Sequence, residues 1–467
     1  MNGHRISALL SFALCAVLTA TIARAGSERT NIRGMGMART FVASARGLDA
    51  VGINPANLGY PDVGTVTLSL LPFGVHIGTD MMTYGIYRDF FTGVATDSGR
   101  VGRTLSESDK QTIIDGFQDG VGRGAGDAEL RPLGISVDLG AQGRFALSLT
   151  EQVAAQARVP KEFVQFFLFG NAPGSVYDFG ETRVGAQWTR EYALSYGRRV
   201  PTPPFLRSLA AGVAVKYVQG YAYFAMEHSG TSLVTGTDGV LQGRINMMTR
   251  SSGFHRLQNG EDTGVETLFD PVGTGWGIDL GVAGEVNEYL SFGIAVTDIG
   301  SVEWDKDLEI FKTDSSFTID NPFSEAQRNA IEDAVKGKKM PGEPFSSSLP
   351  TKLRVGVAVD LSRAPFFKTY LWSPLLVELD YNQGFDNIPG ATTRARFSLG
   401  VEYSPLSWLP LRTGIAFGGE DRSNFAFGLG FHASFLDFDL ASENLNWIFD
   451  QDNFSYASVA MGLKFRF

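Results

Sequence analysis

Alternation of apolar and polar residues with a period of two runs through most of this chain, and it constrains the fold more than any other feature. In 353–361 the apolar set faces one way and Arg354 and Asp360 face the other. In 394–403 Phe397 and Val401 oppose Arg394 and Arg396. Because successive side chains of a strand point to opposite faces, each such segment predicts a strand with one apolar and one wet face.

Two architectures have such strands, a soluble β-sandwich and a transmembrane barrel. The apolar face here is rich in Phe, Leu and Val over many successive segments, whereas the opposite face carries Gly, Ala, Ser and paired charges. Short and long junctions also alternate, as periplasmic turns and outer loops do. A mean hydropathy of −0.02 argues against a bundle of transmembrane helices. The pattern therefore favours an all-β fold, a transmembrane antiparallel β-barrel.

Pairing the alternating segments predicts about fourteen strands, an even number as single-chain barrels require. We place them at 63–77, 131–140, 144–154, 182–198, 208–225, 273–286, 289–303, 351–361, 374–384, 394–404, 410–419, 424–434, 435–444 and 456–467. Tight turns are expected at 140–143, 287–288 and 406–410. Aromatic residues near such junctions are candidates for an interfacial girdle, namely Tyr370, Trp372 and Trp408.

Short helices are predicted in two of the long connections. Ser106–Phe117 opens with a capping residue, and Ser324–Lys336 reads as a helix with Ser324 and Gln327 as a capping box. A hairpin turn is expected around 237–239. The apolar stretch 164–169 (VQFFLF) falls in a loop between strands. We expect one barrel with decorated loops and no second core domain.

The first 25 residues read as a signal peptide rather than a membrane anchor. Arg5 precedes a short apolar run, and Ala23-Arg24-Ala25 fits a cleavage site. The single cysteine, Cys15, lies inside that peptide, so the mature chain has no disulfide and no thiolate metal site. It keeps 38 basic against 50 acidic residues, which argues against nucleic acid as a partner.

Residues 26–62 do not alternate, and they precede a barrel predicted over 63–467. A disordered periplasmic tail is one interpretation, but the segment is rich in small residues and Pro55 stiffens it. A plug folded into the lumen fits better. At the other end, 456–467 alternates cleanly and stops at Phe467, which resembles the terminal signal that the barrel-assembly machinery reads.

The start of the mature chain resembles the long-chain fatty acid transporter (FadL/TodX) superfamily, including its PorV-like and uncharacterised relatives. The residues that carry the resemblance are Gly34-Met35-Gly36-Met37-Ala38, Asp49 and Asn54-Pro55-Ala56. The resemblance implies a fourteen-stranded barrel closed by an N-terminal plug. It also implies that these plug residues gate passage, or else form a packed stopper. Apolar residues of an outer ligand site would then be Val164, Phe166, Phe167 and Phe169, unless that stretch only packs against the barrel rim.

Residues typical of catalysis or metal binding are scattered. The histidines lack metal-ligand spacing, and no cofactor motif occurs. Asp437 and Asp439 share a strand face, where a cation site or a salt-bridge network is conceivable, and the network is favoured. The expected basic members are Arg354, Arg394, Arg396, Arg412 and Lys464. His432 and Ser434 resemble a lipase pair on one strand face, but their parity points to the lumen, so we expect no enzyme.

Two functions remain open from the sequence. One is a passive outer-membrane channel for hydrophobic or small molecules, gated by the plug. The other is a non-transporting barrel that docks secreted or surface proteins, as a PorV-like scaffold would. Either one implies contact with outer-membrane lipid and with the barrel-assembly machinery. Neither one requires a cofactor.

Overall fold

Fourteen antiparallel strands form one closed ring in the structure, a computed structural model. It describes residues 31–97, 99–117, 119–254, 256, 269–321, 324–419, 423–444, 452 and 455–467. The ring strands, in order of pairing, are β1 (Val66–Thr79), β4 (Val121–Asp138), β5 (Arg144–Pro160), β7 (Arg183–Val200), β8 (Ser208–Ser229), β11 (Gly273–Glu285), β12 (Leu290–Trp304), β16 (Lys352–Asp360), β17 (Leu375–Gly384), β18 (Arg396–Leu406), β19 (Leu409–Gly418), β20 (Ser423–His432), β21 (Leu436–Ser442) and β22 (Tyr456–Arg466). The predicted fourteen-stranded barrel is confirmed.

The ring closes between its first and last strands. β1 pairs with β4 on one side and with β22 on the other. Phe467 extends that seam, because its carbonyl accepts the N–H groups of Thr65 (2.6 Å) and Val66 (3.0 Å) and its own N–H donates to Val66. A closed ring leaves no unpaired strand edge around the barrel wall.

The two faces of the wall differ as the alternation predicts. Large apolar side chains point outward and are exposed, as Leu280 (51 %), Phe397 (58 %) and Phe431 (50 %) show. Charged side chains such as Arg354 and Glu378 point inward and are buried. An apolar exterior around a polar interior is the arrangement of a barrel surrounded by lipid.

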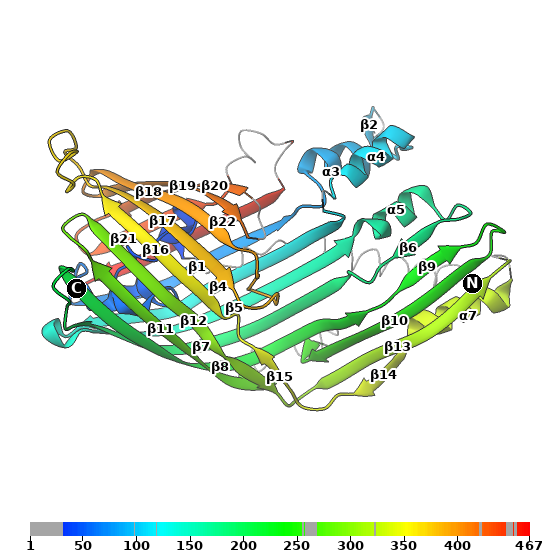
Figure 1. The fold of residues 1–467 in the computed structure, drawn as a ribbon, viewed down its shortest axis with the longest axis horizontal. Helices are drawn as coiled ribbons and strands as arrows, with labels where there is room; N and C mark the ends of the chain where they lie inside the picture. The colour runs from blue at the N-terminus through cyan, green and yellow to red at the C-terminus, as the bar shows by residue number, and fades with distance from the viewer. Residues whose placement is uncertain are drawn as a thin grey trace.

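The two ends of the barrel carry different connections (Figure 1). At the end where Phe467 lies, here called the turn end, five connections are short, 139–143, 201–207, 286–289, 407–408 and 433–435, and a sixth, 361–374, is longer. At the opposite end, the loop end, lie the helices α3 (Tyr84–Phe91), α4 (Glu107–Asp115), α5 (Lys161–Phe169) and α7 (Glu325–Lys336). None of the described helices is long and apolar enough to cross a membrane.

Further strands extend the sheet beyond the ring at the loop end (Figure 1). β8 changes partner there: it pairs with β11 up to Gly220 and with β10 from Tyr223 onward. The added strands are β6 (Val176–Asp178), β9 (Ser232–Thr235), β10 (Leu241–Ser252), β13 (Leu308–Ile319), β14 (Lys338–Pro341) and β15 (Phe345–Ser348), and β2 (Val94–Thr96) pairs with β3 (Gly99–Val101) separately. β9 and β10 flank the predicted turn at 237–239, where Gly239 has a φ of 83°.

Residues 31–62, here called the N-terminal segment, are almost wholly buried and contact the inward faces of the ring strands. The segment contains α2 (Ile32–Gly36) and the 3-10 helices η1 (Gly47–Ala50) and η2 (Pro55–Gly59). Its backbone lies against inward-facing glycines, where a Cβ atom would overlap it: Gly197, Gly212, Gly281, Gly293, Gly356, Gly400, Gly414 and Gly428. Because glycine has no side chain, these eight positions leave the space that the segment occupies.

Some predictions need correction. The α4 helix and its cap are confirmed, with Ser106 and Asp109 forming the box. The box predicted at Ser324 is wrong, because Ser324 makes no capping hydrogen bond and Gln327 instead accepts the N–H groups of Asp320 and Asn321. Stretch 164–169 lies in the connection between β5 and β6, where it forms the greater part of α5. The predicted signal peptide 1–25, including Cys15, lies outside the described residues.

Candidate functional site

Two carboxylates of β17 hold the middle of the N-terminal segment against the wall. Asp380 Oδ2 accepts the backbone N–H groups of Phe41 (2.7 Å) and Val42 (3.0 Å). Glu378 Oε1 accepts the N–H of Ala43 (2.6 Å). Both side chains are buried and sit two residues apart on one strand face. They therefore satisfy three successive backbone donors that no regular secondary structure would satisfy.

Ion pairs fix the start of the segment. Arg33 donates to both carboxylate oxygens of Glu402, at 2.9 and 3.0 Å. Arg412 bridges the same carboxylate (2.6 Å) to Asp439 (2.5 Å), and His432 lies 3.1 Å from Asp439. This chain of alternating charges joins α2 to strands β18, β19, β20 and β21. Bidentate arginine–carboxylate pairs fix orientation as well as distance.

A second arginine of the segment is paired more deeply. Arg39, which is 2 % exposed, contacts Glu443 with a closest distance of 2.6 Å. Arg396 of β18 donates to the carbonyl of Ala38 (2.9 Å) and lies 3.6 Å from Glu443. Since a buried charge is costly unless paired, the wall and the segment depend on each other here.

The barrel wall is interrupted in the middle of β1 and β4. Their register runs from Leu70–Leu133 directly to Phe73–Leu130, so Leu71-Pro72 and Arg131-Pro132 fall outside the ladder. Leu71 has a φ of 50° and bulges outward, 61 % exposed. Proline has no N–H to donate, so one at the same level of both strands prevents a regular ladder there.

Directly beside this interruption, β22 has Gly462. A Cβ at Gly462 would lie 2.6 Å from Ile32 Cδ1 and 2.7 Å from Pro72 Cβ. Ile32 of the N-terminal segment therefore lies against the inner side of the wall at the level where three strands pair irregularly. We call Leu71, Pro72, Arg131, Pro132 and Gly462 the wall gap.

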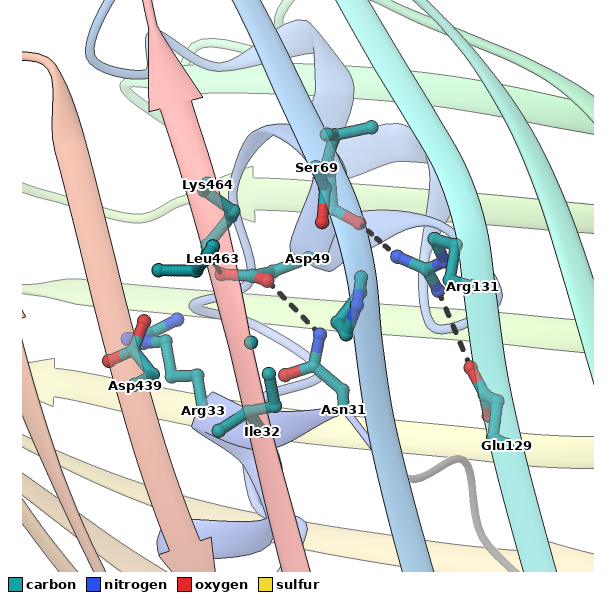
Figure 2. Close-up of a pocket in the computed structure, with 13 residues that line it drawn as sticks. Asn31, Ile32, Arg33, Asp49, Ser69, Glu129, Arg131, Asp439, Leu463 and Lys464 are labelled. Atoms are coloured by element: carbon teal, nitrogen blue, oxygen red, sulfur yellow. Dashed lines mark hydrogen bonds and ion pairs between the residues drawn. The ribbon is translucent and has the colours of Figure 1, made fainter.

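A small cavity lies between the wall gap and the N-terminal segment (Figure 2). Asn31, Ile32, Arg33 and Asp49 face it from the segment, and Arg131, Glu129 and Lys464 face it from the wall. Its volume is about 30 Å³, room for about one or two water molecules. Asp49 closes one side by accepting from Asn31 (3.1 Å) and pairing with Lys464 (2.8 Å). The wall gap is therefore shut from inside in this conformation.

A wider cavity of about 200 Å³ opens under the segment toward the turn end. Arg33, Arg46, Arg412, Lys464 and Arg466 line it together with Asp49, Asp62 and Glu402. Arg46 donates to the carbonyls of Ala43 and Ala45 and stacks over Tyr60. The polar lining agrees with access from water at this end.

The residues predicted to form a plug all lie within the N-terminal segment and are brought together inside the barrel. Gly34 leaves room for the Phe41 ring, and Gly36 lies against Gly428 of β20. Asn54 caps η2 through the Ala56 N–H and donates to the carbonyl of Val282 (3.2 Å). The positions of the other members are given by their contacts: Asp49 with Lys464, Pro55 with Gly197 and Gly212, and Ala56 within the cluster of Tyr60, Ala210 and Ala283.

The apolar stretch predicted for an outer ligand site lies on α5 at the loop end, far from the wall gap along the strands. Val164 packs on the cluster of Met81, Phe117 and Val159. Phe166 meets Tyr177 edge-on at 5.6 Å, whereas Phe167 and Phe169 are 48 % and 39 % exposed. The stretch thus has one packed side and one exposed side, which fits rim packing for the first two residues.

Five of the residues predicted for a lumen polar network are buried in the barrel, and among them Arg412 pairs with Asp439 at 2.5 Å. Arg354, Arg396, Arg412, Asp437 and Asp439 are buried inside the barrel. Arg394 is not among them, because it precedes β18, is 37 % exposed and pairs with Asp119 (3.6 Å) at the loop end. Among the described residues, no group of His, Cys, Asp and Glu is arranged to hold a metal ion.

His432 and Ser434 do not form the lipase-like arrangement that was weighed from the sequence. His432 ends β20 with its ring toward Asp439, but Ser434 lies in the following turn and is exposed. The prediction that the two share a strand face is therefore wrong, because the strand stops two residues early.

The most informative site residues missed from the sequence are the partners of the segment, namely Arg33, Arg39, Glu378, Asp380 and Glu443. Strand parity alone places Glu378 and Asp380 in the lumen, so the alternation pattern held a signal for them. The pattern held no signal that shows which backbone groups these carboxylates bind, since that depends on how the N-terminal segment folds.

Fold and site together define a membrane-spanning barrel of fourteen strands with an N-terminal segment folded into its lumen. A closed ring with an apolar outer face is the form in which strands cross an outer membrane, and that is the location of this chain. By sequence, the chain belongs to the Family of unknown function (DUF5723), which matches residues 62–443. A comparison with curated proteins finds no match.

Solved structures with a similar fold include hydrocarbon transporters and channels. The Ralstonia pickettii toluene transporter TbuX is 13 % identical, with 95 % of this chain and 99 % of that chain covered and a TM-score of 0.46. A Pseudomonas aeruginosa FadL homologue is also 13 % identical, with 95 % and 99 % covered and a TM-score of 0.40. A mutant of the monoaromatic hydrocarbon channel TodX is 11 % identical, with 93 % and 98 % covered and a TM-score of 0.46.

Proposed function

We propose that this protein is a passive outer-membrane channel for small hydrophobic molecules, which leave or enter the lumen sideways through the wall gap. The observation that carries the proposal is the paired interruption of β1 and β4, with Pro72 and Pro132 at one level and Gly462 beside them. A wall that only encloses the lumen needs no such break. A solute that moves between the lumen and the lipid needs an opening in the wall.

The N-terminal segment acts as the gate in this proposal. The cavity behind the gap, at about 30 Å³, is much smaller than the apolar cavity of about 150 Å³ that accommodates benzene. Passage therefore needs Ile32 and its neighbours to move away from Gly462. The charged contacts that hold α2 and η1, above all Arg33–Glu402 and Asp49–Lys464, set the cost of that movement.

The test is uptake of a radiolabelled monoaromatic hydrocarbon by cells that express the protein in their outer membrane. Gly462→Leu places a side chain against Ile32 and Pro72 and is expected to abolish the protein-dependent uptake. Gly102→Leu is the matched control, because a Cβ at Gly102 has nothing within 4 Å. Equal uptake through both variants, at equal amounts of folded barrel, would contradict the proposal.

The second candidate is a non-transporting scaffold for a secreted or surface protein. It is favoured by the sheet that β10 and β13 extend beyond the ring at the loop end (Figure 1). If this candidate holds, a variant with residues 232–252 and 308–341 removed loses a partner that co-purifies with the full chain. Cells that express the full chain then take up no more hydrocarbon than cells without the protein.

A further inference from the structure

The connection between β17 and β18, residues 385–395, folds into the barrel instead of outward, and we call it the inner loop. Gln156 of β5 donates to the carbonyl of Asn387 (3.1 Å), and Gln187 of β7 donates to the carbonyl of Pro389 (3.1 Å). Four strands separate β7 from β17 one way around the ring, and six separate β18 from β5 the other way. These hydrogen bonds therefore span the lumen.

The inner loop has a defined shape of its own. The Gly384 N–H donates to the Thr392 carbonyl (2.8 Å) at its base, and Ile388 pairs with Ala391 at its tip. Asn387 Oδ1 accepts the N–H of Thr393 (3.1 Å). Ala391 and Thr392 are each 2 % exposed. The loop is thus a folded hairpin whose tip rests on the opposite wall.

That wall is shaped to receive the tip. A Cβ at Gly185 of β7 would lie 3.1 Å from Pro389 Cγ, and one at Gly390 would lie 3.8 Å from Ala154 Cβ. Glycine and alanine at the contact points let the loop approach closely. The contact is uncharged, since amide groups and small apolar atoms make it.

Separate cavities lie on the two sides of the inner loop. The one toward the loop end measures about 320 Å³ and is lined by Gln187, Tyr223, Ser347, Ser348 and residues 386–389. The deeper one measures about 40 Å³ and includes Ala154, Asp298, Lys352 and Gly390. Neither lining includes a residue of the N-terminal segment. The lumen is therefore divided at a level that the segment does not reach.

We propose that the inner loop is a second closure of the lumen, which acts separately from the N-terminal segment. A solute from the loop end first meets the 320 Å³ cavity, whose floor is Asn387, Ile388 and Pro389. Two neutral hydrogen bonds hold the tip across the lumen, and near the base Arg394 pairs with Asp119 at 3.6 Å, so this closure is held apart from the ion pairs of the N-terminal segment.

The test is ion conductance in planar bilayers, which does not depend on hydrocarbon transport. Four proteins are compared: the full chain, a variant lacking residues 31–60, a variant with 385–391 replaced by Asn-Gly, and the combination of both changes. The hydrogen bond between Gly384 and Thr392 at the base of the loop lets the two-residue turn connect the strands. We expect the combination to conduct severalfold more than either single change. A combination no more conductive than the variant lacking 31–60 overturns the proposal.

A disulfide provides a second measurement in case the shortened loop misfolds. Gly185→Cys with Pro389→Cys, placed in the variant lacking 31–60 and in a Cys15→Ala background, joins loop and wall at two positions in contact, since a Cβ at Gly185 would lie 3.1 Å from Pro389 Cγ. Oxidation should lower conductance severalfold, and reduction should restore it, while Gly185→Cys alone should not respond. Equal conductance of the oxidised and reduced pair overturns the proposal, whatever the outcome of the hydrocarbon assay.

Discussion

At the scale of single residues, the barrel holds its N-terminal segment by two opposite means. Glycines on the wall remove atoms so that the backbone can approach, and carboxylates on the wall add acceptors where that backbone has free donors. Strand parity predicts from the sequence that these residues face the lumen. It cannot predict which of them the segment contacts, because a non-alternating stretch of small residues carries no register.

Filling one wall glycine is expected to displace the segment. Gly212→Val places side-chain atoms where Pro55 and Ala56 lie, an overpacking that costs about 1–3 kcal/mol. Trypsin should then cleave folded barrels at Arg39, which is 2 % exposed when the segment is in place. Gly102→Val is the control, because that position is open. Unchanged protection in Gly212→Val would show that the segment does not need this contact.

Removing the β17 carboxylates should loosen the segment without adding bulk. Glu378→Ala with Asp380→Ala leaves three buried N–H groups unpaired, each at about 1–3 kcal/mol. Hydrogen exchange at Phe41, Val42 and Ala43 is expected to rise steeply. Glu378→Gln with Asp380→Asn keeps acceptor oxygens and should exchange more slowly than the alanine pair. The same rate in both pairs would argue that shape, not hydrogen bonding, holds these amides.

At the scale of secondary structure, alternation predicts strands well where lipid covers one face and poorly elsewhere. β4 begins at Val121, ten residues before its predicted start, because the outward side of VGRGAGDAEL carries only glycine and alanine before Leu130. β13 is not among the predicted strands, because Thr313 and Ser315 interrupt the apolar residues of its more buried face and the other face is polar from Lys312 onward. Helices α4 and α7 were found from capping residues and helical spacing, yet only one of the two caps forms.

The difference between those two caps gives a matched test. Ser106→Ala removes a capping hydrogen bond to the Asp109 N–H and should cost α4 about 0.5–2 kcal/mol of helix stability. Amides in the first turn of α4 are then expected to exchange faster. Ser324→Ala should leave α7 unchanged, because its hydroxyl caps nothing. An equal effect in both helices would refute the distinction.

At the scale of the whole molecule, the fourteen strands and the polar lumen could be predicted because one physical rule applies to every strand. The site could not be predicted to the same degree. The wall gap depends on two prolines, Pro72 and Pro132, being at one level of adjacent strands, and that level is fixed only by the register of the closed ring. The position of the inner loop depends on contacts with strands on the opposite side of the lumen, and no local sequence pattern encodes such contacts.

The terminal residue offers a test of how the barrel is assembled. Phe467→Ala keeps the backbone hydrogen bonds to Thr65 and Val66 and removes only the exposed ring. If assembly reads the aromatic ring, folded barrel in the outer membrane should fall severalfold, as judged by heat-modifiable mobility on gels. Deleting Phe467 also removes the seam bonds and should lower it further. Normal yield from Phe467→Ala would restrict the role of this residue to the seam.

The ion pair between Asp49 and Lys464 joins the first folded part of the chain to its last strand. β22 is also the strand that closes the ring against β1. A chain that lost β22 would therefore leave the wall open and at the same time leave Asp49 without its lysine, so one strand serves both the enclosure and what it encloses.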